Sequence, residues 1–152
     1  MDYKFEVVET AEQPVLSIKA VTSAANLQQD IGNAYDKIKA YLKELGEDPS
    51  DAPFAAYFNM DMEKLEVEMG FPVSKKLNGK DNISASVIPP SKMAICIYKG
   101  SYTEMKSAYD AMSKWMEDNR HIPSGVVYEF YYNSPLEVPE SELLTKICFI
   151  LK

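Results

Sequence analysis

The chain has 152 residues, of which 46% are hydrophobic and 26% are charged, so it is long enough to bury one core and its composition excludes a disordered chain. Its 23 acidic and 16 basic residues give a net charge of −7 and its lysines are scattered, so we do not expect nucleic acid as a partner. No apolar run approaches the roughly 20 residues of a membrane span and the first residues do not resemble a signal peptide, so we expect a cytoplasmic protein with no membrane partner.

The first half of the chain predicts strands and one helix, in an order that the second half repeats. Alternating or continuous apolar residues around the Gln13-Pro14 break are typical of two short strands joined by a turn. Apolar side chains then recur every three or four residues, which predicts a helix that Gly46 ends. The elements predicted for this half are strands at 3–9 and 15–21, a helix at 27–45, and a strand hairpin at 54–60 and 64–73.

The second half begins after a polar linker that contains Gly79. Two strands broken by Pro89-Pro90 lead to a helix that starts near Ser101 and has a single apolar face. The elements predicted for this half are strands at 84–90 and 93–100, a helix at 102–116, and strands at 126–133 and 146–151.

Two motifs recur at one spacing and indicate an internal duplication. Ala-Tyr-Asp at 34–36 returns at 108–110, and Tyr-x-Asn at 57–59 returns at 131–133; 108 − 34 and 133 − 59 both equal 74. Coincidence in a tyrosine-rich chain is the alternative explanation.

The duplication predicts the fold class and the place of a binding site. We expect one α+β domain over residues 1–152, made of two strand-helix-strand-strand units related by a pseudo-twofold axis, with an antiparallel sheet that carries both long helices on one face. The repeats span about 12–74 and about 84–152. A ligand would then bind in a cleft between the two repeats.

A carboxylate within an aromatic strand is the main candidate for chemistry. Glu129 shares one strand face with Tyr131, and a carboxylate there is costly to desolvate unless a cation or hydrogen-bond donors meet it. Two interpretations stay open: a solvated strand face, or the floor of an aromatic pocket in which Glu129 is the counter-charge of a cationic ligand. Glu68 is the second candidate carboxylate, although its strand face could be plain surface.

Aromatic side chains supply the candidate walls of this pocket. The predicted wall residues are Tyr57, Phe71, Tyr102, Trp115 and Tyr131. Trp115 and Tyr109 lie at a helical spacing that favours packing against the sheet, and an edge of either could still line the cleft.

Motifs of catalysis and of metal binding are absent from the sequence. It has no nucleophile elbow, no phosphate-binding glycine loop and no Cys-x-x-Cys, and Cys96 and Cys148 are typical of buried reduced thiols. The lone His121 lacks a partner at ligand spacing, so we expect neither a metal nor a cofactor. A binding protein is therefore favoured, while Glu129 or Glu68 beside a tyrosine leaves a hydrolase open.

Four segments carry a resemblance to a known family. They are EQPVLSIKAV, LEVEMGFPV, YKGSYTEMKSAYDAMSKWM and, with the greatest specificity, VVYEFYYNSPLEVPESELLTKICFIL. Over nearly its whole length the chain resembles a stand-alone GyrI-like small-molecule-binding domain, similar to the effector-binding domains of bacterial multidrug-responsive transcription activators.

The resemblance implies a function as well as a fold. It implies that aromatic, lipophilic cations bind in an aromatic cleft between the repeats, with Glu129 as the pocket carboxylate that meets the cation and Glu68 as the corresponding glutamate of the first-repeat hairpin. The activators carry a DNA-binding domain ahead of this module, and this chain begins with the first strand, so we do not expect it to regulate DNA alone. By analogy with other members, the alternatives are a hydrolase of cyclopropane-bearing genotoxins and a gyrase-interacting protective protein.

Overall fold

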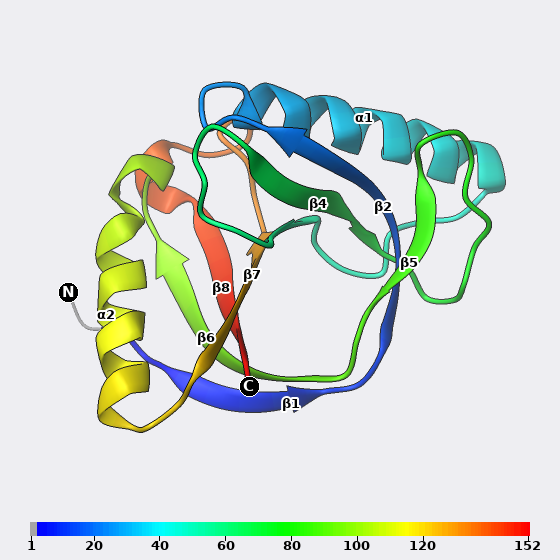
Figure 1. Cartoon of the computed structure of the whole chain (residues 1–152). Coiled ribbons are helices and arrows are strands. Elements are labelled where there is room, and N and C mark those ends of the chain that lie inside the picture. The colour runs from blue at the N-terminus through cyan, green and yellow to red at the C-terminus, as the bar shows by residue number, and fades with distance from the viewer. Residues whose placement is uncertain (1–2) are drawn as a thin grey trace. The chain divides into compact units, whose positions relative to one another are not determined.

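The structure is a computed structural model that describes residues 3–152. Their contacts divide the chain into two compact units. One unit comprises residues 11–90, and the other comprises residues 3–10 together with 91–152. Each described unit contains one long helix and one antiparallel group of strands (Figure 1).

The unit of residues 11–90 pairs its strands in the order β3-β4-β2-β5, all antiparallel. The predicted hairpin is present as β3 and β4. The elements are β2 (Gln13–Thr22), α1 (Leu27–Leu45), β3 (Phe54–Tyr57), β4 (Leu65–Pro72) and β5 (Ser84–Ile88).

The other unit pairs its strands in the order β1-β6-β8-β7, again antiparallel. Strand β7 has a bulge between Pro123 and Val127, where Gly125 adopts a φ of 99° that suits glycine. The elements are β1 (Glu6–Thr10), β6 (Ser91–Lys99), the 3-10 turn η1 (Tyr102–Glu104), α2 (Lys106–Asp118), β7 (Pro123–Tyr131), the 3-10 turn η2 (Glu140–Glu142) and β8 (Leu144–Leu151).

The two units have the same topology, which confirms the predicted duplication. In chain order, β2-α1-β3-β4 and β6-α2-β7-β8 are each strand, helix, strand, strand, and in each the fourth strand pairs with both the first and the third. The two asparagines of the repeated Tyr-x-Asn motif also make equivalent hydrogen bonds to the backbone. Asn59 accepts a hydrogen bond from the backbone N–H of Glu66 at 3.1 Å, and Asn133 accepts one from that of Leu144 at 2.9 Å. Each amide donates to the carbonyl two residues before that N–H.

The helix faces predicted from apolar spacing are the buried faces. Helix α1 buries Ile31, Ile38 and Leu42, and α2 buries Met112 and Met116. Removing such side chains from water provides the main driving force for each unit to fold.

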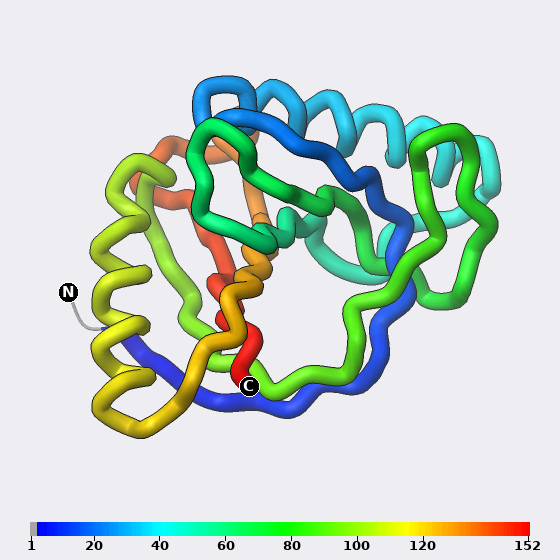
Figure 2. Tube along the Cα trace, in the orientation of Figure 1, coloured from blue at the N-terminus to red at the C-terminus, as the bar shows by residue number. Residues whose placement is uncertain are grey.

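Strand pairing does not follow the order of the strands in the chain. β1 and β2 follow one another in the chain but do not pair: β1 pairs with β6, and β2 pairs with β4 and β5. Figure 2 shows the first strand, in blue, beside the light-green start of β6. Spacing of apolar residues predicts that a strand forms but carries little information on which distant strand completes its hydrogen bonds.

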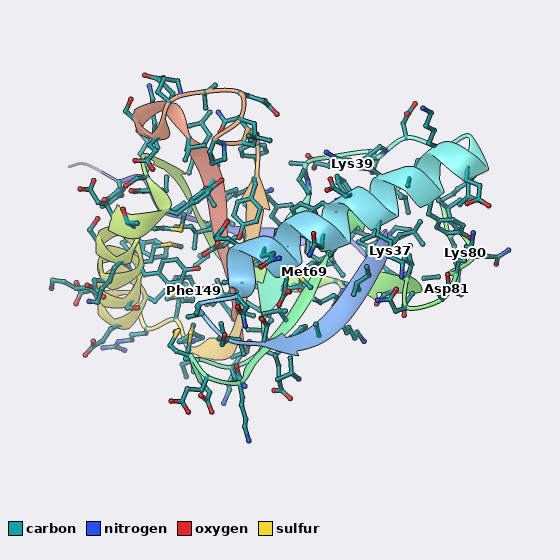
Figure 3. The ribbon with its side chains drawn as sticks, turned by 90° about the horizontal axis from the view of Figure 1, so that it is seen from above. Lys37, Lys39, Met69, Lys80, Asp81 and Phe149 are labelled. Atoms are coloured by element: carbon teal, nitrogen blue, oxygen red, sulfur yellow. The ribbon has the colours of Figure 1, made fainter. Side chains whose placement is uncertain are left out.

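The labelled lysines of the unit of residues 11–90 lie at the surface. Figure 3 labels Lys37 and Lys39 on α1 and Lys80 on the loop that follows β4. Lys37 bonds Asn82, and Lys80 forms an exposed ion pair with Glu44 at 3.2 Å. Such exposed pairs contribute little to stability.

Candidate functional site

Glu129 lies in the interior of its unit. It sits near the end of β7 and pairs in register with Ile147 of β8. Its neighbour on the same strand face, Val127, belongs to the apolar core that contains residues of α2. Only 9% of Glu129 is exposed, so the carboxyl is buried between the strands and α2 rather than placed on a solvated face.

Two tyrosine hydroxyls hold the carboxyl of Glu129. Tyr109 of α2 donates a short hydrogen bond to Oε2, and Tyr131 of β7 donates one to Oε1 at 2.7 Å. Among residues 3–152, no lysine, arginine or histidine forms an ion pair with Glu129. The charge on this carboxylate is therefore met by neutral donors alone.

Burial dominates the acidity of this carboxyl. It raises the pKa of Glu129 above its ordinary value, while the hydrogen bonds from Tyr109 and Tyr131 act in the opposite direction. A buried carboxyl with a raised pKa is a candidate functional group when it lacks a structural ion pair.

Further aromatic rings pack on the two tyrosines that hold the carboxyl. The ring of Tyr102 meets that of Tyr131 edge to face with 5.9 Å between centroids, and Tyr109 meets Phe149 in the same way at 5.4 Å. Burial and the nearby Glu129 carboxylate both raise the pKa of Tyr102. We define the Glu129 site as Glu129, Tyr102, Tyr109, Tyr131 and Phe149.

Trp115 makes its ring contacts elsewhere in the same unit. Its ring centroid is 5.6 Å from that of Phe5 and 5.4 Å from that of His121. Of the predicted wall residues, the structure thus brings Tyr102 and Tyr131 to Glu129. It places Trp115 against the residue that precedes β1 and against the turn after α2.

The three other predicted residues lie in the unit of residues 11–90. Glu68 is buried at 5% exposure and accepts a hydrogen bond of 2.6 Å from the Ser17 hydroxyl. Phe71 packs on Tyr35 of α1 with 5.3 Å between centroids, and Tyr57 ends β3 opposite Val67. Because side chains alternate along β4, Glu68 and Phe71 point to opposite faces of that strand.

Tyr109 contacts Glu129 but was not among the predicted ligand-binding residues. Its signals in the sequence are a helical spacing that left an edge free to line the cleft and the repeated Ala-Tyr-Asp motif, whose matching Tyr35 instead donates to the carbonyl of Phe54 at 2.7 Å. The repeat therefore identified a structural position and not the partner that each tyrosine finds.

The remaining reactive groups offer little chemistry. Cys96 and Cys148 are free and buried, and burial raises the pKa of the Cys148 thiol to about 12, so almost no thiolate forms at neutral pH. Within residues 3–152 no cluster of histidine, cysteine, aspartate and glutamate could hold a metal ion. In the same range no helix is both long and apolar enough to cross a membrane.

Comparison with protein families gives one match that covers nearly the whole chain. The model of the GyrI-like small molecule binding domain matches residues 3–152. No curated protein matches the chain in sequence.

Several solved structures share the fold. The EcmrR–DNA complex has a TM-score of 0.84 and 21% identity over 99% of this chain, which spans only 57% of the EcmrR chain. The EcmrR C-terminal domain has a TM-score of 0.76 and 21% identity, with 100% of this chain and 99% of that chain covered.

Two further structures share the fold at lower identity. A hydrolase from Listeria innocua has a TM-score of 0.71 and 11% identity, with 98% and 92% of the two chains covered. The SAV2435 structure, which contains tetraphenylphosphonium, has a TM-score of 0.65 and 10% identity, with 100% and 94% covered. At these identities the likeness establishes a common fold and nothing further.

Proposed function

We propose that this chain, which belongs to the GyrI-like small-molecule-binding domain family, binds aromatic, lipophilic cations, with the Glu129 carboxylate as the counter-charge. The observation that carries the proposal is a buried carboxylate held by two neutral hydroxyls, with no cationic side chain paired to it among residues 3–152. A carboxylate of this kind is costly in its charged form until a cation joins it.

The arrangement of Glu129 suits a cation that arrives from outside the chain. The hydroxyls of Tyr109 and Tyr131 fix the two carboxyl oxygens, so the negative charge is oriented before a ligand binds. Burial raises the pKa of Glu129, and a bound cation would lower it again, because an opposite charge favours the ionised form. Cation affinity should therefore rise with pH as Glu129 ionises.

The surrounding rings suit the organic part of such a ligand. Tyr109 and Tyr131 contact the carboxyl, and Tyr102 and Phe149 pack on them. Aromatic faces attract cations as well as apolar surface. The tetraphenylphosphonium in the structurally similar SAV2435 is a ligand of this class. Glu68, Tyr57, Phe71 and Trp115 stay predicted ligand contacts, each to be tested by substitution.

A pair of ligands tests the counter-charge role. Tetraphenylphosphonium is a cation without hydrogen-bond donors, and triphenylphosphine oxide is a neutral compound with similar rings. We expect Glu129→Gln to weaken binding of the cation by about 1–3 kcal/mol, or roughly 5- to 150-fold, and to affect the neutral compound less. Titration calorimetry or displacement of a rhodamine-like dye measures both affinities.

The matched control is Glu66→Gln, which makes the same chemical change on β4 at an exposed glutamate. It should leave both affinities unchanged. Equal losses for the cation and the neutral compound in Glu129→Gln would contradict the counter-charge role, as would a wild-type protein that binds no lipophilic cation.

Hydrolysis of a reactive ligand is a second candidate, because the same carboxyl could act as a general base. Glu129 has a raised pKa and two adjacent tyrosine hydroxyls, which are the groups needed to accept a proton from water and to orient it. Product analysis after incubation with strained electrophiles such as cyclopropanes separates the two functions. A hydrolase would yield ring-opened product that Glu129→Gln does not form, whereas a binding protein would return the compound unchanged.

A further inference from the structure

One buried hydroxyl in the described part of the chain has no hydrogen-bond partner. Thr145 is 0% exposed, and among residues 3–152 its Oγ1 is the buried side-chain atom left without a partner. Native proteins satisfy the great majority of such atoms, because an orphaned buried hydroxyl is costly. This exception calls for an explanation.

Strand register places Thr145 beside the Glu129 site. On β8, Thr145 pairs with Tyr131 of β7 and, on its other side, with Tyr98 of β6. Directly paired residues in an antiparallel sheet project to the same face, and Glu129 pairs with Ile147, two residues further along β8. Thr145 therefore lies on the face of Glu129, one residue pair away.

The neighbouring hydroxyls are directed to other acceptors. Tyr131 donates to Glu129, and Tyr98 donates to the carbonyl of Ser101 at 2.7 Å. Neither satisfies Thr145. The Thr145 hydroxyl therefore remains available as an acceptor, and as a donor, for a group brought in from outside.

We propose that Thr145 is a specificity-determining residue of the Glu129 site, whose hydroxyl oxygen accepts a hydrogen bond from the N–H of a protonated amine bound to Glu129. The inference rests on the proposed function and narrows its ligand class. Both Glu129 oxygens already accept tyrosine hydroxyls, so an ammonium N–H benefits from a further acceptor nearby. Quaternary ammonium and phosphonium ions have no N–H and cannot use it.

Access to Thr145 requires an aromatic ring to move. Tyr102 and Tyr131 are half-buried and meet edge to face, and Tyr131 stands directly across from Thr145. In the proposed complex the Tyr102 ring moves off Tyr131, which keeps its hydrogen bond to Glu129, and the amine reaches both the carboxylate and the threonine. The free protein then carries an unsatisfied group that the ligand satisfies.

This assignment predicts opposite effects of one substitution on stability and on binding. Thr145→Val keeps the shape of the side chain and removes the hydroxyl, so the free protein should unfold at the same or a higher urea concentration. The variant should bind a protonated primary amine that carries a tricyclic aromatic ring, and so has an N–H for each acceptor, about 2- to 12-fold more weakly. The N-methylated quaternary salt of the same amine should bind with unchanged affinity.

Thr10→Val is the matched control. Thr10 is also a strand threonine, but its hydroxyl donates to the carbonyl of Ser91 and accepts from the Ser91 N–H, both at 3.2 Å. Its loss should lower the urea midpoint and leave both affinities unchanged.

Three results would overturn the assignment of Thr145. The first is an equal change in affinity for the amine and its quaternary salt, and the second is no change in affinity for either. The third is a lower urea midpoint for Thr145→Val, because that would mean that a water already satisfies the hydroxyl. If the wild-type protein binds neither cation, the proposed function fails and this inference fails with it. If the wild-type protein binds both cations and Thr145→Val changes their affinities equally or not at all, only the inference fails.

Discussion

Glu129 stands where the first copy of the repeat has an alanine. At the spacing of the repeat, 129 − 74 equals 55, and Ala55 pairs with Met69 as Glu129 pairs with Ile147. Ala55 is fully buried, so the position itself belongs to a packed interior. A carboxylate there lowers stability relative to an apolar side chain, which is the pattern expected where function overrides packing.

The cost of this carboxylate should appear in the pH dependence of stability. Burial raises the pKa of Glu129 in the folded chain, whereas glutamate in an unfolded chain has a pKa of about 4.3. The folded state thus binds more protons, so the stability contributed by Glu129 is full below about pH 4.3 and is lost as the pH rises through the folded pKa.

Glu129→Gln removes that dependence, because glutamine does not titrate. We expect the free energy of unfolding of the wild type, minus that of the variant, to fall as the pH rises above about 4.3. Urea unfolding followed through Trp115, the single tryptophan, measures the difference at each pH. A difference that stays constant or grows with pH would show that Glu129 is not destabilised by burial.

Part of the site could be predicted from residue types alone. The alternation of β7 correctly placed Glu129 and Tyr131 on one face, because side-chain direction in a strand follows from position. Tyr109 and Thr145 could not be assigned in this way. Tyr109 reaches Glu129 from a different element. The Thr145 hydroxyl lacks a partner because none of its neighbours in space forms a hydrogen bond with it, which the sequence does not show.

At the scale of elements, the two helices end in the same way at equivalent residues. Gly46 and Arg120 both have left-handed backbones, with φ of 72° and 60°, and 120 − 46 equals 74. The N–H of the next residue bonds a carbonyl of the last turn in each case, Glu47 to Leu42 at 2.9 Å and His121 to Met116 at 2.8 Å. This is the geometry of a Schellman cap.

Opposite exchanges at the two caps, glycine to a side chain at residue 46 and a side chain to glycine at residue 120, should change stability in opposite directions. Gly46→Ala should lower the free energy of unfolding by about 1 kcal/mol, because the new Cβ meets no atom within 4 Å and the cost is that of a left-handed L residue. Arg120→Gly should raise it by about 0.5 kcal/mol, since relief at the cap exceeds the added freedom of the unfolded chain. Urea unfolding of both variants is the measurement, and changes of the same sign would contradict the equivalence of the caps.

Elements were predictable to the extent that local patterns determine them. The helix at Leu27–Leu45 follows its apolar spacing and its glycine stop. The second helix begins at Lys106 after the turn Tyr102–Glu104, because the apolar spacing continues through that turn and does not distinguish 3-10 from α geometry. The pairing of β1 with β6 could not be predicted, because local patterns do not identify a partner strand that is distant in the sequence.

At the scale of the whole molecule, two units of one topology differ at the position of Glu129, which is Ala55 in the other unit. Both units share one strand order and one pattern of asparagine hydrogen bonds, and the family match covers residues 3–152. The repeat was detectable because motifs such as Tyr-x-Asn hold the same backbone bonds in both copies. Its predicted bounds, about 12–74 and about 84–152, stay a prediction, as do the cleft between the repeats and the cytoplasmic location.

The net charge of −7 complements the proposed ligands, because a negative surface attracts cations over a distance set by the salt concentration. That attraction acts on any cation. Selectivity must therefore come from the buried carboxyl and its rings.

The ionisation of Glu129 can be followed directly by carbon-13 NMR of its carboxyl, identified by comparison with Glu129→Gln, in the free protein and at saturation with tetraphenylphosphonium. A cation that pairs with this carboxylate must lower its pKa by linkage, and the same factor must strengthen cation binding when Glu129 is ionised. We predict a raised pKa in the free protein that falls when the cation binds. A carboxyl whose pKa is the same in both states would show that the cation binds elsewhere.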